Sequence, residues 1–225
     1  MQYLLPQDCL LCGVNAGGEM LCVPCLHALP YRDHLACPRC SLPTPTGGIC
    51  GRCLTKPPPF DRAVAAFDYR YPVAELVHAF KYGSQLALGR FLSDKLVQRL
   101  QSESWPDLIV PMPLYPSRLA ERGFNQAAEL ARWIADATGL SLSRSALIKT
   151  RDTLPQVGLP WRDREANVRG AFACDADLAG MRVAIIDDVM TTGASLGEAA
   201  KVIKQQGATE VAVWVVARTL SDAEK

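Results

Sequence analysis

Short apolar runs alternate with segments of helical periodicity from Asp61 to the end of the chain. Apolar runs of strand length occupy residues 62–69, 107–114, 146–151, 183–188 and 210–219. Between them, apolar residues recur at helical spacing over residues 73–82, 88–100, 124–139 and 195–208. Strands that alternate with helices in this way predict a mainly parallel, doubly wound sheet of the α/β class.

The first fifth of the chain lacks this alternation and carries most of the cysteines instead. Eight of the nine cysteines lie between Cys9 and Cys53, and only Cys174 lies outside, where we expect a small core residue. The eight form two units of the pattern C-x2-C-x9-C-x2-C, and the second unit repeats the first at a constant offset, as from Cys9 to Cys37. The segment is therefore an internal repeat.

Each unit holds two C-x-x-C pairs, and two such pairs complete the tetrahedral ligand set of one zinc ion. The repetition favours one structural zinc within each unit, with the ligands Cys9, Cys12, Cys22 and Cys25, and then Cys37, Cys40, Cys50 and Cys53. An interleaved pairing across the units is an alternative. A disulfide-rich segment is another, although clustered pairs in a chain without an export signal favour metal.

The other polar residues of this segment suggest little further chemistry. His27 and His34 are expected at the surface, because the eight cysteines already fill two sites. Arg32, Arg39 and Arg52 would form only a thin basic surface, which gives little support for nucleic-acid binding by the ribbons.

A proline-rich stretch separates the two parts of the chain. We predict a double zinc ribbon over residues 1–56, a stiff linker over 57–60 and an α/β domain over 61–225. Lys and Arg total 24 against 23 acidic residues, so the overall charge predicts no polyanionic partner. The N-terminus does not resemble a signal peptide, and the apolar run 211–217 is too short to span a bilayer. We therefore expect a cytoplasmic protein without a membrane span.

The stretch "VAIIDDVMTTGAS", residues 183–195, carries the most specific chemistry. An apolar strand is followed by Asp187 and Asp188, and then by a turn that opens a helix. Backbone N–H groups and hydroxyls of this turn can converge on an anion at the positive end of the helix. The residues of the turn are Met190, Thr191, Thr192, Gly193, Ala194 and Ser195. A carboxylate beside a phosphate suits a vicinal diol, and the two together describe a ligand that contains ribose 5-phosphate.

Two alternatives remain open for this stretch. In the first, the acids are surface turn residues beside an ordinary helix N-cap. The second concerns direction, because adjacent residues of a strand point to opposite faces. Asp187 and Asp188 can both reach one sugar only if the strand ends between them or directly after them. Otherwise one binds the diol and the other orients a loop or a hydrated Mg²⁺.

This stretch is similar to the phosphoribosyl-diphosphate motif of type I phosphoribosyltransferases. Four C-x-x-C pairs precede it, together with "FKYG" at 80–83, "VPMPLYPSRLAERGFNQAAELA" at 110–131 and "RDTLPQVGLPWRDREANVRGAF" at 151–172. With these segments the whole chain resembles the ComF family of competence-associated proteins. The resemblance implies a type I phosphoribosyltransferase-like domain after a double zinc ribbon, and phosphoribosyl diphosphate bound by the two aspartates and the turn 190–195.

The resemblance also implies further site residues. The segment 111–126 would bind pyrophosphate, with Arg118 and Arg122 as its cations and Gly123 allowing a close approach of the backbone. In the alternative, both arginines are solvated at the start of the next helix. Asn125 and Gln126 either cap that helix or contact substrate.

A long polar segment, 149–170, is similar to the loop that closes over the diphosphate in related enzymes. Its candidate cations are Lys149, Arg151, Arg162 and Arg164. Lys81 is either a phosphate contact or a charge at a helix C-terminus. The catalytic candidates are Asp187, Asp188, Lys81, Arg118 and Arg122.

The implied function is transfer of ribose 5-phosphate from phosphoribosyl diphosphate, with Mg²⁺, to an unidentified acceptor. No general base for an acceptor stands out, and we expect no C-terminal hood, so only the ribbons and residues 61–104 can cover the site. The alternative is a non-catalytic sensor of phosphoribosyl diphosphate or a nucleotide. Its ribbons would then bind DNA or a protein of the competence machinery.

Overall fold

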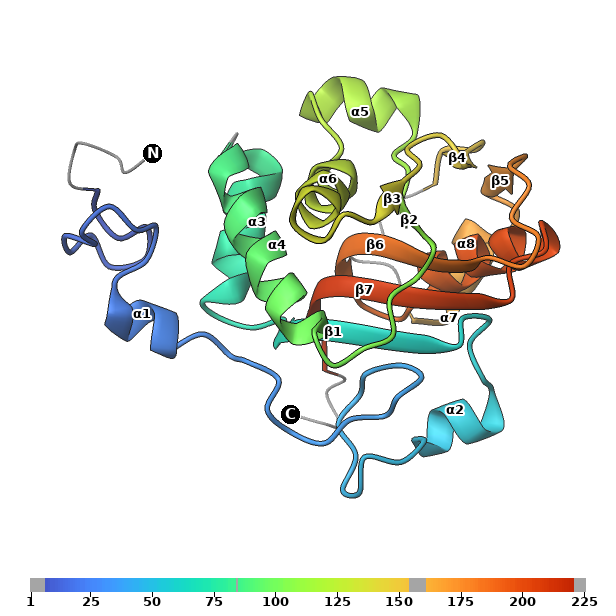
Figure 1. The fold of residues 1–225 in the computed structure, drawn as a ribbon, viewed down its shortest axis with the longest axis horizontal. Helices are drawn as coiled ribbons and strands as arrows, with labels where there is room; N and C mark the ends of the chain where they lie inside the picture. The colour runs from blue at the N-terminus through green and yellow to red at the C-terminus, as the bar shows by residue number, and fades with distance from the viewer. Residues whose placement is uncertain (1–6, 84, 154–160, 221–225) are drawn as a thin grey trace.

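The computed structural model describes residues 7–83, 85–153 and 161–220, without the side chains of 161–164. A five-stranded sheet forms its centre, in the order β1-β7-β6-β2-β3 (Figure 1). Every neighbouring pair is parallel, as predicted. The strands are β1 (Arg62–Asp68), β2 (Leu108–Pro111), β3 (Ser141–Leu142), β6 (Arg182–Met190) and β7 (Glu210–Arg218).

Helices cover both faces of this sheet, which confirms the doubly wound architecture. One face carries α3 (Val73–Tyr82), α4 (Leu86–Leu100) and α6 (Gln126–Thr138), and the other carries α8 (Ala194–Gln205). Alternate residues of β6 serve the two cores: Ala184 and Ile186 pack with the first group of helices, and Val183 and Ile185 pack with α8. Burial on both faces explains why the strand shows no polar alternation.

Three smaller elements differ from the simplest interpretation of the sequence. The predicted strand 146–151 forms β4 (Leu147–Lys149), which pairs antiparallel with β5 (Phe172–Cys174) in a separate two-stranded sheet. A helix, α7 (Trp161–Val168), lies inside the segment predicted as one long loop, and α5 (Pro116–Arg122) lies inside the segment predicted to bind pyrophosphate. Cys174 is buried in the core beside α8, as expected.

The N-terminal ribbons lie against the sheet along the edge strand β1. Backbone hydrogen bonds join Asp68 N to Pro30 O at 2.9 Å and Ala63 N to Pro38 O at 3.1 Å. These contacts cover an edge that would otherwise present unpaired backbone groups. Each ribbon contains one short helix, α1 (Val23–His27) in the first and α2 (Gly51–Thr55) in the second.

Arg32 does not lie on a basic surface, so that prediction was wrong. Its side chain is buried and its guanidinium contacts the carboxylate of Asp68 and the backbone carbonyl of Ser41. A buried cation needs such partners, because it has lost its hydration. His27 and His34 are exposed, as expected.

Within the described ranges, no helix combines the length and the apolar character that a membrane span requires.

Candidate functional site

Both cysteine units form compact four-sulfur clusters. Within each unit the four Sγ atoms lie within 4.8 Å of one another, in the sets Cys9, Cys12, Cys22 and Cys25, and Cys37, Cys40, Cys50 and Cys53. The Sγ atoms of Cys12 and Cys22 are 3.6 Å apart, and those of Cys40 and Cys50 are 3.5 Å apart. A tetrahedron with zinc–sulfur bonds of about 2.3 Å has edges of about 3.8 Å, whereas a disulfide measures about 2.05 Å. The geometry therefore fits one structural zinc per unit and excludes the interleaved pairing.

The two acids of the motif lie inside β6 and not at its end. The neighbouring strand β2 stops at Pro111, opposite Ile186, whereas β6 continues beside β7 until Met190 pairs with Arg218. Asp187 and Asp188 therefore lie where β6 extends beyond one of its neighbours. The alternation of the strand is not kept at this point, because Val189 packs with the first core, like Ile186, and Met190 packs with the second. The charges of both acids act on Lys81.

Asp188 faces the helices of the first core and is buried there. Its Oδ2 lies 2.9 Å from Nζ of Lys81 at the end of α3, and its Oδ1 accepts the N–H of Val189 at 2.6 Å. Burial by itself lowers the pKa of Lys81, but the charge and the hydrogen bond of Asp188 raise it above its ordinary value. Lys81 is therefore a cation that neutralises a buried carboxylate in the unliganded protein.

Asp187 is partly buried, and its surroundings disfavour the ionised form of its carboxyl group. Its Oδ1 accepts the N–H of Asp188 at 2.9 Å. Burial, and then the neighbouring charge of Asp188, raise its pKa to about 7, although the charges of Lys81 and Arg122 oppose this rise. A carboxyl group with so high a pKa beside several cations is typical of a functional site.

Arg122 belongs to the same group of charges and Arg118 lies farther out. Arg122 donates to Oε1 of Gln126 at 2.6 Å, and its guanidinium lies 5.1 Å from the centre of the Tyr82 ring. Arg118 pairs with Glu121, one turn along α5, at 2.9 Å. The structure thus brings Arg122 toward the acids, while Arg118 shares its charge with a neighbour at the surface.

Gly123 ends α5 in the left-handed conformation, with φ 81°, and open space surrounds the position of a Cβ atom. The turn itself, and no close neighbour, therefore requires glycine here. Asn125 caps α6, because its side chain accepts the N–H groups of Ala127 and Ala128. Between the two interpretations of Asn125, capping is the one that the contacts support.

The segment after β4 adds a further cation. Lys149 donates to Oγ1 of Thr153 at 2.8 Å. The pKa of Lys149 lies below its ordinary value, chiefly because of burial. The charges of Arg118 and Arg151 lower it further, whereas the acids Asp152 and Asp187 oppose the shift. The charges of Arg118, Arg151 and Asp187 therefore all act on Lys149. The side chains of Arg162 and Arg164 lie outside the described part of the chain.

The turn after β6 joins the acids to the first turn of α8. Gly193 is the N-cap of α8 with φ 80°, a conformation that favours glycine, and the Oγ1 of Thr192 accepts the N–H of Ala194 at 3.1 Å. Thr191 lies between β6 and this cap, and Ser195 lies in the first helical turn. The side chain of Met190 is buried in the core, so it can act on a ligand only through its backbone.

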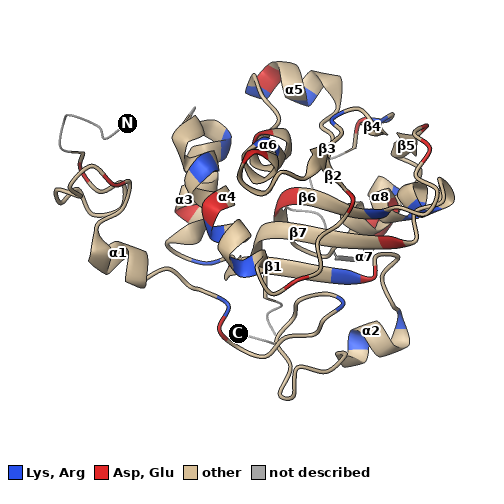
Figure 2. Cartoon of the chain, viewed as in Figure 1, with Lys and Arg blue, Asp and Glu red and all other residues tan. Residues whose placement is uncertain are grey.

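Charges of both signs meet at the carboxyl ends of the strands. In Figure 2 the acidic end of β6 lies toward α3, and basic positions appear on α3 and α5. Parallel sheets bind ligands at this end of their strands.

The sequence pointed to the acids, Lys81 and Arg122, but not to Tyr82, which contacts Arg122, or to Arg218. Arg218 is 2% exposed and donates to backbone carbonyls of the turn. In the sequence, Arg218 could have been recognised as the single cation that directly follows the apolar run 211–217.

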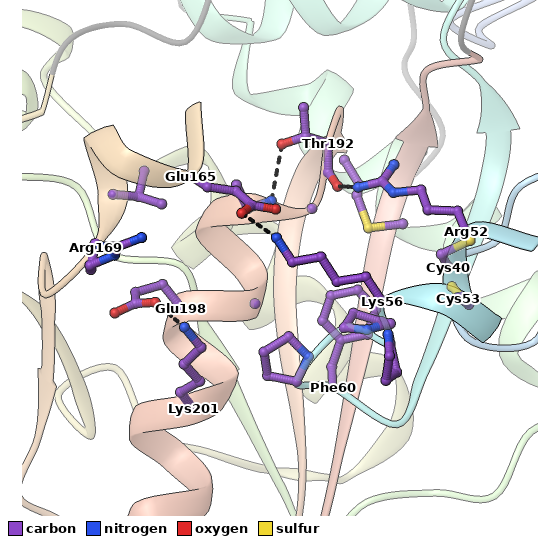
Figure 3. A pocket seen from close by; sticks show the side chains of 18 of the residues that line it. Cys40, Arg52, Cys53, Lys56, Phe60, Glu165, Arg169, Thr192, Glu198 and Lys201 are labelled. Carbon is purple, nitrogen blue, oxygen red and sulfur yellow. Dashed lines mark hydrogen bonds and ion pairs between the residues drawn. The ribbon is translucent and has the colours of Figure 1, made fainter. Parts of the chain in front are cut away.

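A cavity of about 580 Å³ lies on the other side of the turn, between the second ribbon, the linker, α7 and α8 (Figure 3). Its walls include Phe60 and Gly193, and an ion pair of 2.6 Å between Lys56 and Glu165 crosses it. Neither aspartate of the motif lines this cavity. It is therefore separate from the acid-lined end of β6.

Comparison with known proteins identifies both parts of the chain. The Double zinc ribbon domain family matches residues 1–54, and the Phosphoribosyl transferase domain family matches residues 123–225. The DNA utilization protein YhgH of Salmonella typhimurium is 36% identical over 207 residues, which cover 89% of this chain and 91% of that protein. The Competence protein F of Haemophilus influenzae is 34% identical over 182 residues, which cover 75% of this chain and 78% of that protein.

Among solved structures, the chain is similar to the glutamine phosphoribosylpyrophosphate amidotransferase of B. subtilis. The sequence identity is 24%, the TM-score is 0.39, and the match covers 56% of this chain and 25% of that chain.

The two domain matches and the full-length relatives agree with the strand order and the two four-cysteine clusters. The chain belongs to the ComF family, as a double zinc ribbon followed by a phosphoribosyltransferase-type domain.

Proposed function

We propose that the protein binds phosphoribosyl diphosphate together with Mg²⁺ and transfers ribose 5-phosphate to an acceptor. One observation carries the proposal. Two carboxylates on β6 directly precede a glycine-capped turn at the start of α8, and Lys81 and Arg122 stand beside them. A ribose 5-phosphate needs an anion site next to hydrogen-bond acceptors for a diol, and a diphosphate needs cations beyond them.

The different contacts of the two acids suggest different roles for them. Asp188 is already paired with Lys81. We therefore expect that this ion pair must separate before Asp188 can bind ribose hydroxyls and Lys81 can bind the diphosphate. Asp187 accepts one backbone N–H group and has a pKa raised to about 7. A diol or a cation that approached Asp187 would stabilise its ionised form. Ligand binding is therefore favoured by relief of an unfavourable charge state.

Magnesium fits the donor set at this place. Mg²⁺ prefers carboxylate, phosphate and water oxygens, and it usually takes only one or two carboxylates from a protein. Asp187 offers such an oxygen beside the expected diphosphate, whereas Asp188 is paired with Lys81. The ion would supply charge neutralisation for the departing diphosphate.

The protein's own contribution to transfer would be orientation and charge. The bond between the anomeric carbon and the diphosphate oxygen breaks, and a bond from the acceptor to that carbon forms. Arg122 and Lys149 would stabilise the negative charge that collects on the leaving diphosphate. Asp187 would stabilise the positive charge that develops on the sugar ring.

A second candidate function is a sensor of the same ligand that does not catalyse transfer. The observation in its favour is that the second ribbon contacts the turn directly, since Arg52 Nη2 donates to Thr192 O at 2.8 Å. Binding at the turn would then alter the ribbon. The relatives are named for DNA utilization and competence, which makes DNA or a competence protein the expected partner of such a signal.

Turnover distinguishes the two candidates. The protein is incubated with phosphoribosyl diphosphate, Mg²⁺ and a panel of nucleobases, and release of pyrophosphate is followed. We expect release that is abolished in the triple variant Lys81→Ala, Arg118→Ala, Arg122→Ala. A matched control is Arg132→Ala, which removes an arginine paired with Glu129 on α6, outside the proposed site.

Calorimetry on the same samples completes the test. Binding of phosphoribosyl diphosphate without any release would favour the sensor. The absence of both binding and release from the unmodified protein would contradict both candidates. Unchanged affinity in the double variant Asp187→Asn, Asp188→Asn would remove the acids from the site.

A further inference from the structure

Three consecutive backbone carbonyls of the turn accept hydrogen bonds from arginine side chains. Arg218 Nη1 donates to Met190 O at 3.1 Å and also to Thr191 O. Arg52 Nη2 donates to Thr192 O at 2.8 Å, and Figure 3 shows this side chain reaching the turn from the second ribbon. The carbonyl side of the turn is therefore occupied by two guanidinium groups.

This arrangement fixes the direction of the N–H groups. In a planar trans peptide the C=O bond and the N–H bond of the next residue point in opposite directions. Since three carbonyls point toward the arginines, the N–H groups of Thr191, Thr192 and Gly193 point to the opposite side. Successive N–H groups on one side of a turn, with a left-handed residue, form an anion-binding concavity.

Both arginines are linked to the second cysteine cluster. Nε of Arg218 donates to the backbone carbonyl of Cys40, a zinc ligand, at 3.1 Å. Arg52 is the residue before Cys53 in the final C-x-x-C pair, so the zinc-bound knuckle sets where its backbone lies. The second cysteine cluster, the two arginines and the three carbonyls thus form one continuous set of contacts.

We propose that Arg52 and Arg218 are positioning residues, through which the second zinc ribbon holds the turn 191–195 in its anion-binding shape. The inference rests on the proposed function, because it takes the turn to be the phosphate site. The arginines act from behind the turn. Their hydrogen bonds orient the peptides, and their positive charges favour an anion on the open side.

The first zinc site provides the natural comparison. Its residues Cys9, Leu21 and Leu29 pack into the core with α3 and α4. Among the described residues, the second unit is linked to the turn directly, through Arg52, and indirectly, through the Cys40 carbonyl that accepts from Arg218. Loss of the first zinc should therefore leave the turn unaffected.

The chain offers closely matched variants. Arg39 and Arg52 occupy the same place in the two C-x-x-C pairs of the second unit, so Arg39→Ala is the control for Arg52→Ala. Cys22 and Cys50 occupy the same place in the two units, so Cys22→Ser is the control for Cys50→Ser. Arg52→Lys keeps a cationic donor and tests for rescue.

Two measurements are made on full-length protein: amide hydrogen exchange of peptides that cover residues 190–197, and calorimetric affinity for ribose 5-phosphate. Zinc content and melting temperature verify that each variant is folded. We expect Arg52→Ala and Cys50→Ser to accelerate exchange in the turn and to weaken binding about tenfold, as for loss of one charge-assisted hydrogen bond. Arg39→Ala and Cys22→Ser should change neither quantity, and Arg52→Lys should recover most of the affinity.

The outcomes separate this inference from the proposed function. Unchanged exchange in the turn of Arg52→Ala and Cys50→Ser would overturn the inference, and so would faster exchange with unchanged affinity. If the unmodified protein bound no ribose 5-phosphate while exchange in the turn still depended on Arg52 and the second zinc, the phosphate ligand would be refuted. The positioning of the turn by the ribbon would stand.

Discussion

The two zinc ribbons have the same cysteine spacing but different surroundings. In the first unit Cys12 is exposed and only Cys9 is buried, whereas in the second Cys37, Cys40 and Cys53 are all buried. The first ribbon lies beyond α3, and the second lies below β1 and close to the phosphoribosyltransferase-type domain (Figure 1). Identical metal chemistry therefore supports two structures with different neighbours.

The comparison shows that ligand spacing determines which metal a ribbon binds but not the role of that ribbon in the protein. The first ribbon adds apolar side chains to the core beside α3 and α4. In the second ribbon, Arg52 donates to the Thr192 carbonyl of the turn, and the Cys40 carbonyl accepts from the side chain of Arg218. What a small metal-stabilised unit does is thus decided by the residues between its ligands.

The largest effect is expected from Arg218, the buried link between the second ribbon and the turn. Arg218→Met removes the donor from the carbonyls of Cys40, Met190 and Thr191 and leaves them buried without it. We expect a loss of about 3–5 kcal/mol in the free energy of unfolding, measured by urea denaturation.

The control for this variant is Arg182→Ala, which breaks an exposed ion pair with Asp107. Its stability should stay close to that of the unmodified protein. Equal losses in the two variants would mean that Arg218 is not the link that we describe.

The next effect concerns the two metal sites. Metal analysis should find about two zinc ions per chain, since each four-cysteine cluster holds one. Cys50→Ser should lower the melting temperature more than Cys22→Ser, because the second ribbon has the more buried ligands and the contacts to the turn. Differential scanning fluorimetry provides the comparison, and a greater loss for Cys22→Ser would reverse our assignment of the two ribbons.

A smaller effect is expected from the charge of Asp187 and depends on pH. In the folded protein its pKa is raised to about 7 by burial and by Asp188, whereas in the unfolded chain it titrates near 4. Between these values the folded state binds more protons than the unfolded state, so stability falls as the pH rises. Asp187→Asn cannot ionise and should escape this loss.

At pH 8 the melting temperature of the variant should therefore exceed that of the unmodified protein, by about 3 °C for each kcal/mol of unfolding free energy recovered. At pH 4 the two melting temperatures should be equal. Thermal melts across this range measure the difference. A gain that was the same at both pH values would argue against ionisation as its cause.

The smallest effect is expected at Arg118. Its ion pair with Glu121 lies on the exposed side of α5 and follows helical spacing. Arg118→Ala should cost about 0.3–0.5 kcal/mol of stability by urea denaturation. A loss above about 1 kcal/mol would place Arg118 among the structural contacts of the site.

Much of the fold followed from local patterns. Apolar runs and helical periodicity predicted the parallel strands and the helices on both faces, because burial on each face leaves a periodic signal. The end of β6 did not follow from the sequence. Asp187 and Asp188 look like the end of a strand, yet pairing with β7 continues to Met190 because that neighbour is equally long.

Long-range contacts account for what the sequence did not predict at the site. The acids, Lys81 and Arg122 were candidates because charged residues beside a small-residue turn are a local signal. The contact of Tyr82 with Arg122 and the contacts of Arg218 with the turn join residues far apart in the chain. Arg32 was misassigned to the surface for the same reason, since its partner Asp68 lies at the end of β1.

The most direct test of the central claim is a crystal structure of the protein with ribose 5-phosphate. The account predicts the phosphate within hydrogen-bond distance of the N–H groups of residues 191–195, with the sugar hydroxyls toward Asp187 or Asp188. A phosphate bound elsewhere, for example in the cavity beside Lys56 and Phe60, with the turn unoccupied, would contradict it.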